Sequence, residues 1–180
     1  GLGPNDIGFD KSYIVPDGHN MKPDYYIEDG KIEGGTEPPF ESEIKIIERY
    51  GYKLVKHIPK GNWENRRPAE EIGARLAQKA EEFIEQNADK PFFLYFPTCS
   101  IHFPLAPDKR FAGKSGAGVH GDYVMQFDWT IGRIMQTLDR LGLAENTLLI
   151  VTSDNGGYPI SHGAGEEKYR PAAPWRGHKG

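Results

Sequence analysis

Two short apolar runs, residues 92–96 (FFLYF) and 147–152 (TLLIVT), constrain the fold of this 180-residue chain more than any other feature. Each run follows a longer segment in which apolar residues recur at helical spacing, over about 69–87 and about 119–141. Gly142 suits the end of the second helix. Helices that alternate with continuously apolar strands predict an α/β fold in which a mostly parallel sheet is flanked by helices on both faces.

The apolar positions of the two predicted helices define the face that each helix should bury. They are Ile72, Leu76, Ala80, Phe83 and Ile84 in the first helix, and Val124, Phe127, Ile131, Ile134, Met135, Leu138 and Leu141 in the second. Pro68 is suited to the start of the first helix. A loop rich in Pro and Gly, about 97–118, connects the first predicted strand to the second helix.

The region before these elements has weaker periodicity and contains two predicted strand pairs. Residues 25–32 should form a small hairpin, because Asp29-Gly30 suits a two-residue type I′ turn. Residues 44–58 are a second candidate strand pair, centred on Gly51.

Composition limits the class of protein. A hydrophobic content of 37% and a charged content of 27% fit a globular domain. The formal net charge of -4 gives no basic footprint for nucleic acid. No apolar run approaches the roughly 20 residues that cross a bilayer. The single Cys excludes an internal disulfide framework and a multi-Cys zinc site.

The two ends of the sequence suggest a piece of a longer chain. The sequence begins Gly1-Leu2-Gly3-Pro4 without a Met and ends at residues 175–180 without completing an element. We therefore expect part of a domain, and the missing signal peptide carries no information on secretion.

Polar side chains follow both predicted strands. His102 lies in the loop after the first strand, and Asp154 and Asn155 follow the second. Ligands of open α/β sheets collect beyond the carboxyl ends of the strands, so we expect these residues at one edge. Carboxylate and amide oxygens suit Ca²⁺ or Mg²⁺. The alternative is a plain turn, because Asp-Asn-Gly is also good turn chemistry.

Three side chains, two of them not yet discussed, are open to both a chemical and a structural interpretation. His102 is either an acid/base or anion-binding group or a structural His. Lys179, in a Gly-flanked tail, is either a cation for an anionic substrate or a solvated charge. Cys99 is predicted to be a structural thiol, because no cationic neighbour in the sequence lowers its pKa.

Taken together, several motifs of the chain resemble the sulfatase family of the alkaline-phosphatase-like superfamily. In family order they are PFFLYF at 91–96, His-x-Pro at 102–104, KSGAG at 114–118, GDY at 121–123, DRLGLAENT at 139–147, TSDNG at 152–156 and RGHKG at 176–180. The resemblance implies that residues 67–180 belong to the catalytic core and residues 1–66 to a variable region on the substrate side.

The resemblance implies roles for four residues. Asp154 and Asn155 match ligands of the active-site Ca²⁺, which is expected in preference to Mg²⁺. His102 matches the His that contacts the sulfate group and assists the leaving group, and Lys179 matches the Lys that binds sulfate oxygens. The substrate would be a sulfated small molecule or glycan, and the family location is periplasmic, extracellular or lysosomal.

The family nucleophile, a formylglycine made from the first residue of Cys/Ser-x-Pro-x-Arg, has no counterpart here. After Cys99, Ile101 and Phe103 stand where Pro and Arg are required. We therefore expect the formylglycine upstream of Gly1 and expect this chain alone to be inactive. The alternatives are a phosphodiesterase or phosphonate hydrolase of the same superfamily, or a catalytically inert fragment.

Overall fold

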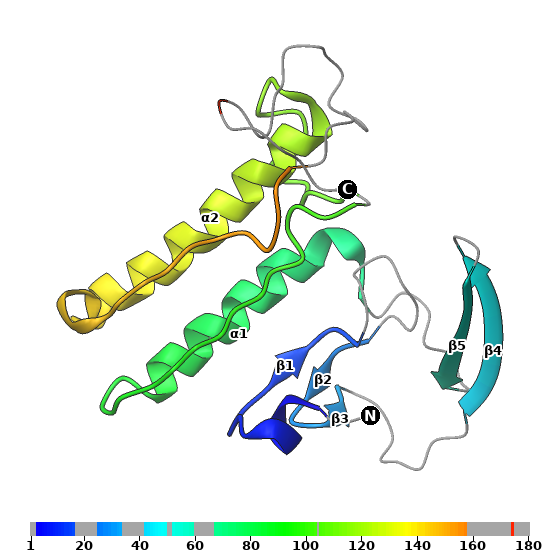
Figure 1. The fold of residues 1–180 in the computed structure, drawn as a ribbon. Coiled ribbons are helices and arrows are strands. Elements are labelled where there is room, and N and C mark those ends of the chain that lie inside the picture. The colour runs from blue at the N-terminus through cyan, green and yellow to red at the C-terminus, as the bar shows by residue number, and fades with distance from the viewer. Residues whose placement is uncertain are drawn as a thin grey trace. The chain divides into compact units, whose positions relative to one another are not determined.

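The computed structural model describes residues 3–16, 25–33, 42–49, 52–59, 67–103, 105–157 and 174, with backbone alone in the ranges 42–49 and 52–59. The chain forms two compact units, Gly1–Ile72 and Gly73–Gly180. Figure 1 shows short strands in the first unit and the two long helices, α1 and α2, in the second.

The first unit contains a small antiparallel sheet of three strands in the order β1 (Tyr13–Ile14), β2 (Ile27–Glu28) and β3 (Lys31–Ile32). It follows the 3₁₀ helix η1 (Pro4–Ile7). Both residues of the β2–β3 turn have positive φ, +47° at Asp29 and +78° at Gly30. These are the signs that a type I′ turn requires, and the predicted hairpin is confirmed.

A second hairpin follows in the same unit. Strand β4 (Ser42–Arg49) pairs antiparallel with β5 (Tyr52–Pro59), from Ser42 opposite Pro59 to Arg49 opposite Tyr52. This confirms the predicted strand pair, while Gly51 lies outside the described residues.

The two predicted helices are present. A 3₁₀ turn, η2 (Ala69–Glu71), leads into α1 (Ile72–Gln86), and α2 spans Gly118–Arg140. Gly142 ends α2 with φ +68°. Its N–H donates to Asp139 O at 3.0 Å, and the N–H of Leu143 donates to Leu138 O at 2.8 Å. This is the Schellman arrangement, which satisfies the last carbonyls of the helix, and η3 (Ala144–Asn146) follows it.

The helices pack on each other through a compact apolar cluster. Ala80 and Ile84 of α1 are buried with Ile134 and Leu138 of α2. Partly buried residues that pack against this cluster are Phe92, Leu94, Phe96, Leu141, Leu143 and Ala144. The core of the second unit is therefore built from α1, α2 and the segments that follow them.

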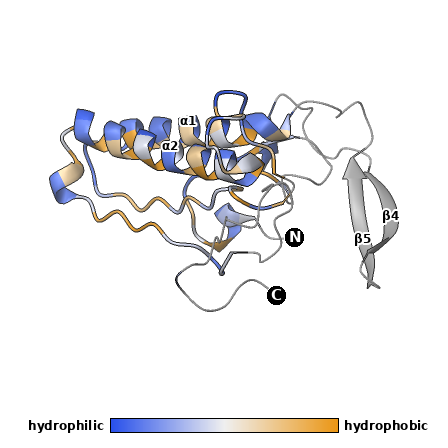
Figure 2. Ribbon diagram, turned by 90° about the horizontal axis from the view of Figure 1, so that it is seen from above, coloured by the Kyte–Doolittle hydropathy of each residue, from blue (hydrophilic) through white to orange (hydrophobic). Residues whose placement is uncertain are grey.

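The two apolar runs are extended but do not form strands. Residues 92, 94 and 96 pack against the helices, whereas Phe93 is 76% exposed and Tyr95 66% exposed. In residues 147–152, Leu148 is 85% exposed and Ile150 73% exposed. Figure 2 shows the helices as one layer with the extended segments beneath them.

The predicted parallel sheet is therefore absent from the described residues, as is a second helical layer. A strand needs a neighbouring strand for its backbone hydrogen bonds, and none joins 92–96 to 147–152 in the described part of the chain. The two segments do run in the same direction along the helices (Figures 1 and 2).

The buried face of α2 differs from the predicted one. Ile134 and Leu138 are buried as expected, but Met135 is 49% exposed. The other buried residues of α2 are Gly121, Tyr123 and four polar residues, Asp122, Gln126, Thr130 and Thr137. Part of the apolar pattern of α2 thus lies outside its contact with α1.

Within the described residues, neither long helix combines the length and the apolar character needed to traverse a bilayer.

Candidate functional site

His102 stands at the end of a tight turn after the first extended segment. Its backbone N–H donates to Cys99 O at 3.0 Å, which closes the turn. Thr98 Oγ1 donates to the carbonyl of Ser100 at 3.2 Å. The imidazole is exposed, as a group that meets a substrate must be.

The backbone selects the tautomer of the His102 ring. Nδ1 lies 2.5 Å from the carbonyl oxygen of Phe103. A carbonyl oxygen only accepts hydrogen bonds, so Nδ1 carries the proton and donates it. Nε2 is therefore the basic nitrogen of the neutral ring and the one that exchanges a proton in acid/base chemistry.

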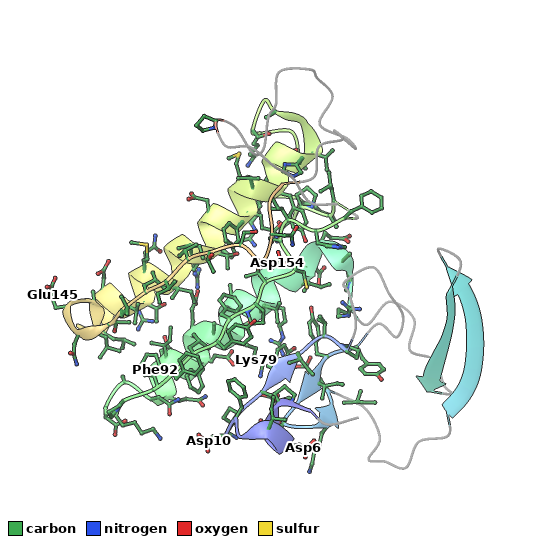
Figure 3. All side chains as sticks on the ribbon, in the orientation of Figure 1. Asp6, Asp10, Lys79, Phe92, Glu145 and Asp154 are labelled. Atoms are coloured by element: carbon green, nitrogen blue, oxygen red, sulfur yellow. The ribbon has the colours of Figure 1, made fainter. Side chains whose placement is uncertain are left out.

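Asp154 and Asn155 follow the second extended segment and are both exposed. Ser153 Oγ donates to the carbonyl of Asn155 at 2.8 Å, which folds the chain back directly after the segment. Figure 3 shows Asp154 where this segment ends. A carboxylate and an amide oxygen in solvent-accessible positions fit a hard cation such as Ca²⁺, which takes about 6–8 oxygen ligands.

The described residues do not complete a cation site. They contain no group of three or more His, Cys, Asp or Glu side chains arranged to hold a metal. Because the extended segments run in the same direction, the loop with His102 and the turn with Asp154 both begin at the same end of the helix pair (Figure 1). Lys179 lies outside the described residues.

The loop between His102 and α2 is held by polar side chains of α2 whose role in the loop was not predicted from the sequence. The Asp122 carboxylate accepts the backbone N–H of Gly113 at 2.8 Å and of Ser115 at 2.9 Å. Burial raises the pKa of Asp122, but the hydrogen bonds from Ser115, Gly113 and Lys114 outweigh it and hold the pKa below its usual value.

The backbone of α2 lies very close to the same loop at Gly121, next to Asp122. A Cβ on Gly121 would lie 2.6 Å from Ser115 Oγ and 2.7 Å from Ala117 Cβ, so only glycine fits there. The Gly121-Asp122 pair was the one signal in the sequence that could have revealed the hydrogen bonds between Asp122 and this loop.

Gln126, one turn further along α2, holds the earlier part of the same loop. Its Oε1 accepts the backbone N–H of Asp108 at 2.7 Å, and the side chain is 1% exposed. The Asp108 carboxylate binds Arg110 through Nε at 3.0 Å and Nη2 at 2.9 Å, and the Arg110 guanidinium lies 4.2 Å from the ring centre of Trp129. The first turns of α2 therefore fix the loop at several points.

A comparison of the sequence with family models places the chain among hydrolases. The model of the sulfatase family matches residues 30–179, and the chain therefore belongs to the sulfatase family. The resemblance noted from its motifs is confirmed.

Individual relatives support the same family. The N-acetylgalactosamine-6-O-sulfatase of Bacteroides thetaiotaomicron is 36% identical over 83% of this chain and 34% of its own length. Human steryl-sulfatase is 44% identical over 47% of this chain and 14% of its own. The chain thus spans about a third or less of the length of these relatives.

The fold agrees with the family. A structure solved in work on the metabolism of multiple glycosaminoglycans by Bacteroides thetaiotaomicron matches with a TM-score of 0.71 and 32% identity, over 87% of this chain and 38% of that chain. The chain therefore has part of a sulfatase-like fold.

Proposed function

We propose that the protein hydrolyses sulfate monoesters with the help of a bound Ca²⁺, and that His102, Lys179, Asp154 and Asn155 belong to its active site. The observation that carries the proposal is the family match, which includes all four positions. The common direction of the two extended segments supports it, because both polar turns then begin at one end of the helix pair.

Asp154 and Asn155 are the residues that would hold the cation. When bound, Ca²⁺ would supply positive charge that stabilises the transferring sulfate group. The carboxylate provides a charged oxygen and the amide a neutral one, and both are accessible at the end of an extended segment. Two donors are too few for Ca²⁺, so other ligands are required.

His102 would act at the leaving oxygen. Its Nδ1 is tied to the Phe103 carbonyl, so the proton that moves is the one on Nε2. A protonated Nε2 would donate to the ester oxygen as it leaves. Lys179 would neutralise the sulfate oxygens, a role that rests on the family resemblance alone.

The nucleophile must come from a residue outside this sequence, which has no Cys/Ser-x-Pro-x-Arg motif. A formylglycine in a longer parent protein would complete the reaction, and mass spectrometry of that protein tests for it. An unmodified Ser or a Thr at the nucleophile position would contradict the sulfatase proposal.

A sulfated glycan is the substrate class that the comparisons support best. Similarity to the N-acetylgalactosamine-6-O-sulfatase covers 83% of the chain, against 47% for human steryl-sulfatase. We therefore expect a sulfated amino sugar to be hydrolysed faster than a sterol sulfate.

The test is sulfate release by the full-length protein from 6-sulfated N-acetylgalactosamine, with His102→Ala and Asp154→Ala as variants. His102→Ala should lower kcat by about 10²- to 10⁴-fold, the usual contribution of a general acid. Asp154→Ala should also lower kcat, because it removes a proposed ligand of the cation. Asp128→Asn, at an exposed position of α2, is the control and should retain activity. Hydrolysis of phosphodiesters but not of sulfate esters would overturn the proposal.

A further inference from the structure

Asn155 is the only asparagine of the chain that is followed by a glycine. It lies at the bend after the second extended segment, and both Asn155 and Gly156 are exposed to solvent. The proposed reaction uses the Asn155 amide only as an oxygen ligand. An exposed amide beside an unhindered backbone N–H also has a chemistry of its own, because the backbone nitrogen can attack the side-chain carbonyl carbon and close a succinimide ring.

Among the described residues, no hydrogen bond restrains either reacting group. The Asn155 side-chain amide and the Gly156 N–H have no hydrogen-bond partner in that part of the chain. The hydrogen bond at this bend runs from Ser153 Oγ to the backbone carbonyl of Asn155 at 2.8 Å, so it does not involve the side chain. The amide can therefore rotate until its carbonyl carbon meets the Gly156 nitrogen.

Gly156 removes the steric barrier to this reaction. A side chain on the residue after an asparagine crowds the attacking nitrogen, and glycine has no side chain. The φ angle of Gly156 is not positive, in contrast to that of Gly113 or Gly142, so the backbone does not require glycine at this position. An alanine at position 156 is therefore compatible with the backbone and changes the crowding of the nitrogen.

Two of the other described asparagines lack this combination of features. Asn87 Nδ2 donates to the carbonyl of Phe83 at 2.7 Å, and the next residue is an alanine. The N–H that follows Asn146 belongs to a threonine and donates to the carbonyl of Ala144 at 3.2 Å. In both cases one reacting group is held by a hydrogen bond and the attacking nitrogen is crowded, whereas Asn155 has neither restraint.

We propose that Asn155 is a deamidation site, at which the protein without a bound cation converts one of its own proposed ligands. The Gly156 nitrogen gives its proton to water and attacks Cγ of Asn155, so that a C–N bond forms. The Cγ–Nδ2 bond then breaks, and Nδ2 takes up a proton from water and leaves as ammonia. Water opens the succinimide at either of its carbonyls, which gives aspartate or isoaspartate without any oxidant.

Both products alter the proposed cation site. Aspartate places a second carboxylate directly beside that of Asp154, where the unmodified chain has a neutral amide. Isoaspartate in addition routes the backbone through the former side chain, which lengthens the chain between Asp154 and Gly156 and moves the carboxylate. This consequence rests on the proposed function, in which Asn155 is a ligand, whereas the deamidation itself is a property of this chain.

Peptide mass spectrometry of the 180-residue chain, incubated without divalent cations, measures the reaction at each asparagine. The peptide with Asn155 should gain the mass added by exchange of an amide for an acid, while the peptides with Asn87 and Asn146 stay unchanged. Gly156→Ala should slow the conversion severalfold, and Asn155→Asp supplies the chromatographic standard for the aspartate product. Conversion at Asn155 that is no faster than at Asn87 and Asn146 overturns the proposal, and so does a wild-type rate in Gly156→Ala.

The wild-type chain unfolded in urea provides a test that needs no variant. It gives the rate of the unrestrained sequence, and the folded chain should convert at a comparable rate, because no described hydrogen bond holds the two reacting groups. A folded chain that converts far more slowly than the unfolded one would show that the fold restrains Asn155, and the proposal would be wrong.

The full-length protein separates this proposal from the proposed function. Ca²⁺ should slow the conversion of Asn155, because ligation through Oδ1 would fix the orientation of the amide, and the readout is mass rather than activity. Equal conversion with and without Ca²⁺, in a protein that releases sulfate, would overturn the proposed effect on the cation site. Conversion at Asn155 in a protein that releases no sulfate would contradict the proposed function and support the deamidation site.

Discussion

Asp122 of α2 accepts more of the described hydrogen bonds from the loop before α2 than any other residue of the helix. Asp122 is 3% exposed, and its carboxylate accepts the N–H groups of Gly113 and Ser115. These donors favour the charged form, which is why the pKa of Asp122 falls below its usual value despite burial. The same contacts make the loop sensitive to pH.

Asp122→Asn should destabilise the chain by about 1–3 kcal/mol at neutral pH, the range for a hydrogen bond to a charged group. Because the folded-state pKa is lowered, the stabilisation is complete above the unfolded value of about 3.9 and is lost as pH falls through the folded value. The free energy of unfolding, measured in urea from pH 7 to pH 3, should therefore fall less steeply with decreasing pH in the variant than in the wild type. The same decrease with falling pH in Asp122→Asn and in the wild type would contradict this account. Asp128→Asn, at an exposed position, is the control.

The sequence pointed to some candidate residues at this scale and not to others. His102, Asp154 and Asn155 were predicted as site residues because their chemistry follows an apolar run and matches a family motif. The roles of Asp122 and Gln126 in holding the loop were not predicted, although Asp122 belongs to the GDY motif, because these roles depend on burial. Burial in turn depends on the rotation of α2 and the path of the loop, and neither is encoded in the local sequence.

At the scale of elements, a glycine of α1 lies directly against a side chain of α2. A Cβ on Gly73 would lie 2.0 Å from Gln126 Nε2. The Gln126 side chain is buried and bound to Asp108 N, so it cannot move without breaking that hydrogen bond. The absence of a side chain at Gly73 therefore leaves room for Gln126, and Gln126 holds the loop that precedes α2.

Gly73→Ala should destabilise the chain by about 1–2 kcal/mol, since overpacking exceeds the gain in helix propensity. Gly132→Ala is the matched change, because a Cβ there meets nothing within 4 Å. It should stabilise the chain by about 0.5–1 kcal/mol. Urea unfolding measures both, and equal effects of the two substitutions would show that the close contact is unimportant. In a Gln126→Ala background the cost at Gly73 should vanish.

Two ion pairs between α1 and α2 differ in burial, so they allow the effect of burial on an ion pair to be measured. Arg133 binds both carboxylate oxygens of Glu81, whose side chain is 11% exposed, whereas Arg140 binds Glu85, whose side chain is 46% exposed. Arg133→Met should cost about 1–3 kcal/mol, because it leaves Glu81 buried without this partner. Arg140→Met should cost less than about 1 kcal/mol. If thermal unfolding shows that the two variants lose the same stability, burial does not determine the contribution of these ion pairs.

Elements with internal hydrogen bonds were predictable, and elements that need distant partners were not. Helical periodicity located α1 and α2, and Asp29-Gly30 located a hairpin, because each signal is local. Residues 92–96 and 147–152 have the composition of strands, but a parallel strand forms only beside another strand. No strand of the described residues pairs with either segment. Exposed side chains such as Phe93 and Leu148 show, in addition, that no second layer of described residues covers that face.

At the scale of the whole molecule, the proposed cation site is incomplete within the described residues. Asp154 and Asn155 would supply two oxygens, the described residues contain no group of three or more His, Cys, Asp or Glu side chains arranged to hold a metal, and Ca²⁺ requires about 6–8 oxygen ligands. Under this proposal water would supply the rest in the isolated chain. The chain should consequently bind Ca²⁺ far more weakly than a complete sulfatase site would.

Calorimetric titration of the 180-residue chain with Ca²⁺ should show a Kd no tighter than about 10⁻⁴ to 10⁻³ M, the range of weak protein sites. Asp154→Ala with Asn155→Ala should remove whatever heat is observed, because these are the proposed ligands. Asp128→Asn should leave it unchanged. Binding at micromolar Ca²⁺ would mean that the chain contains a nearly complete site, and the assignment of two ligands to a shared cage would then be wrong. Weak binding here together with tight binding by the full-length protein would instead support a cage assembled from distant parts of one sequence.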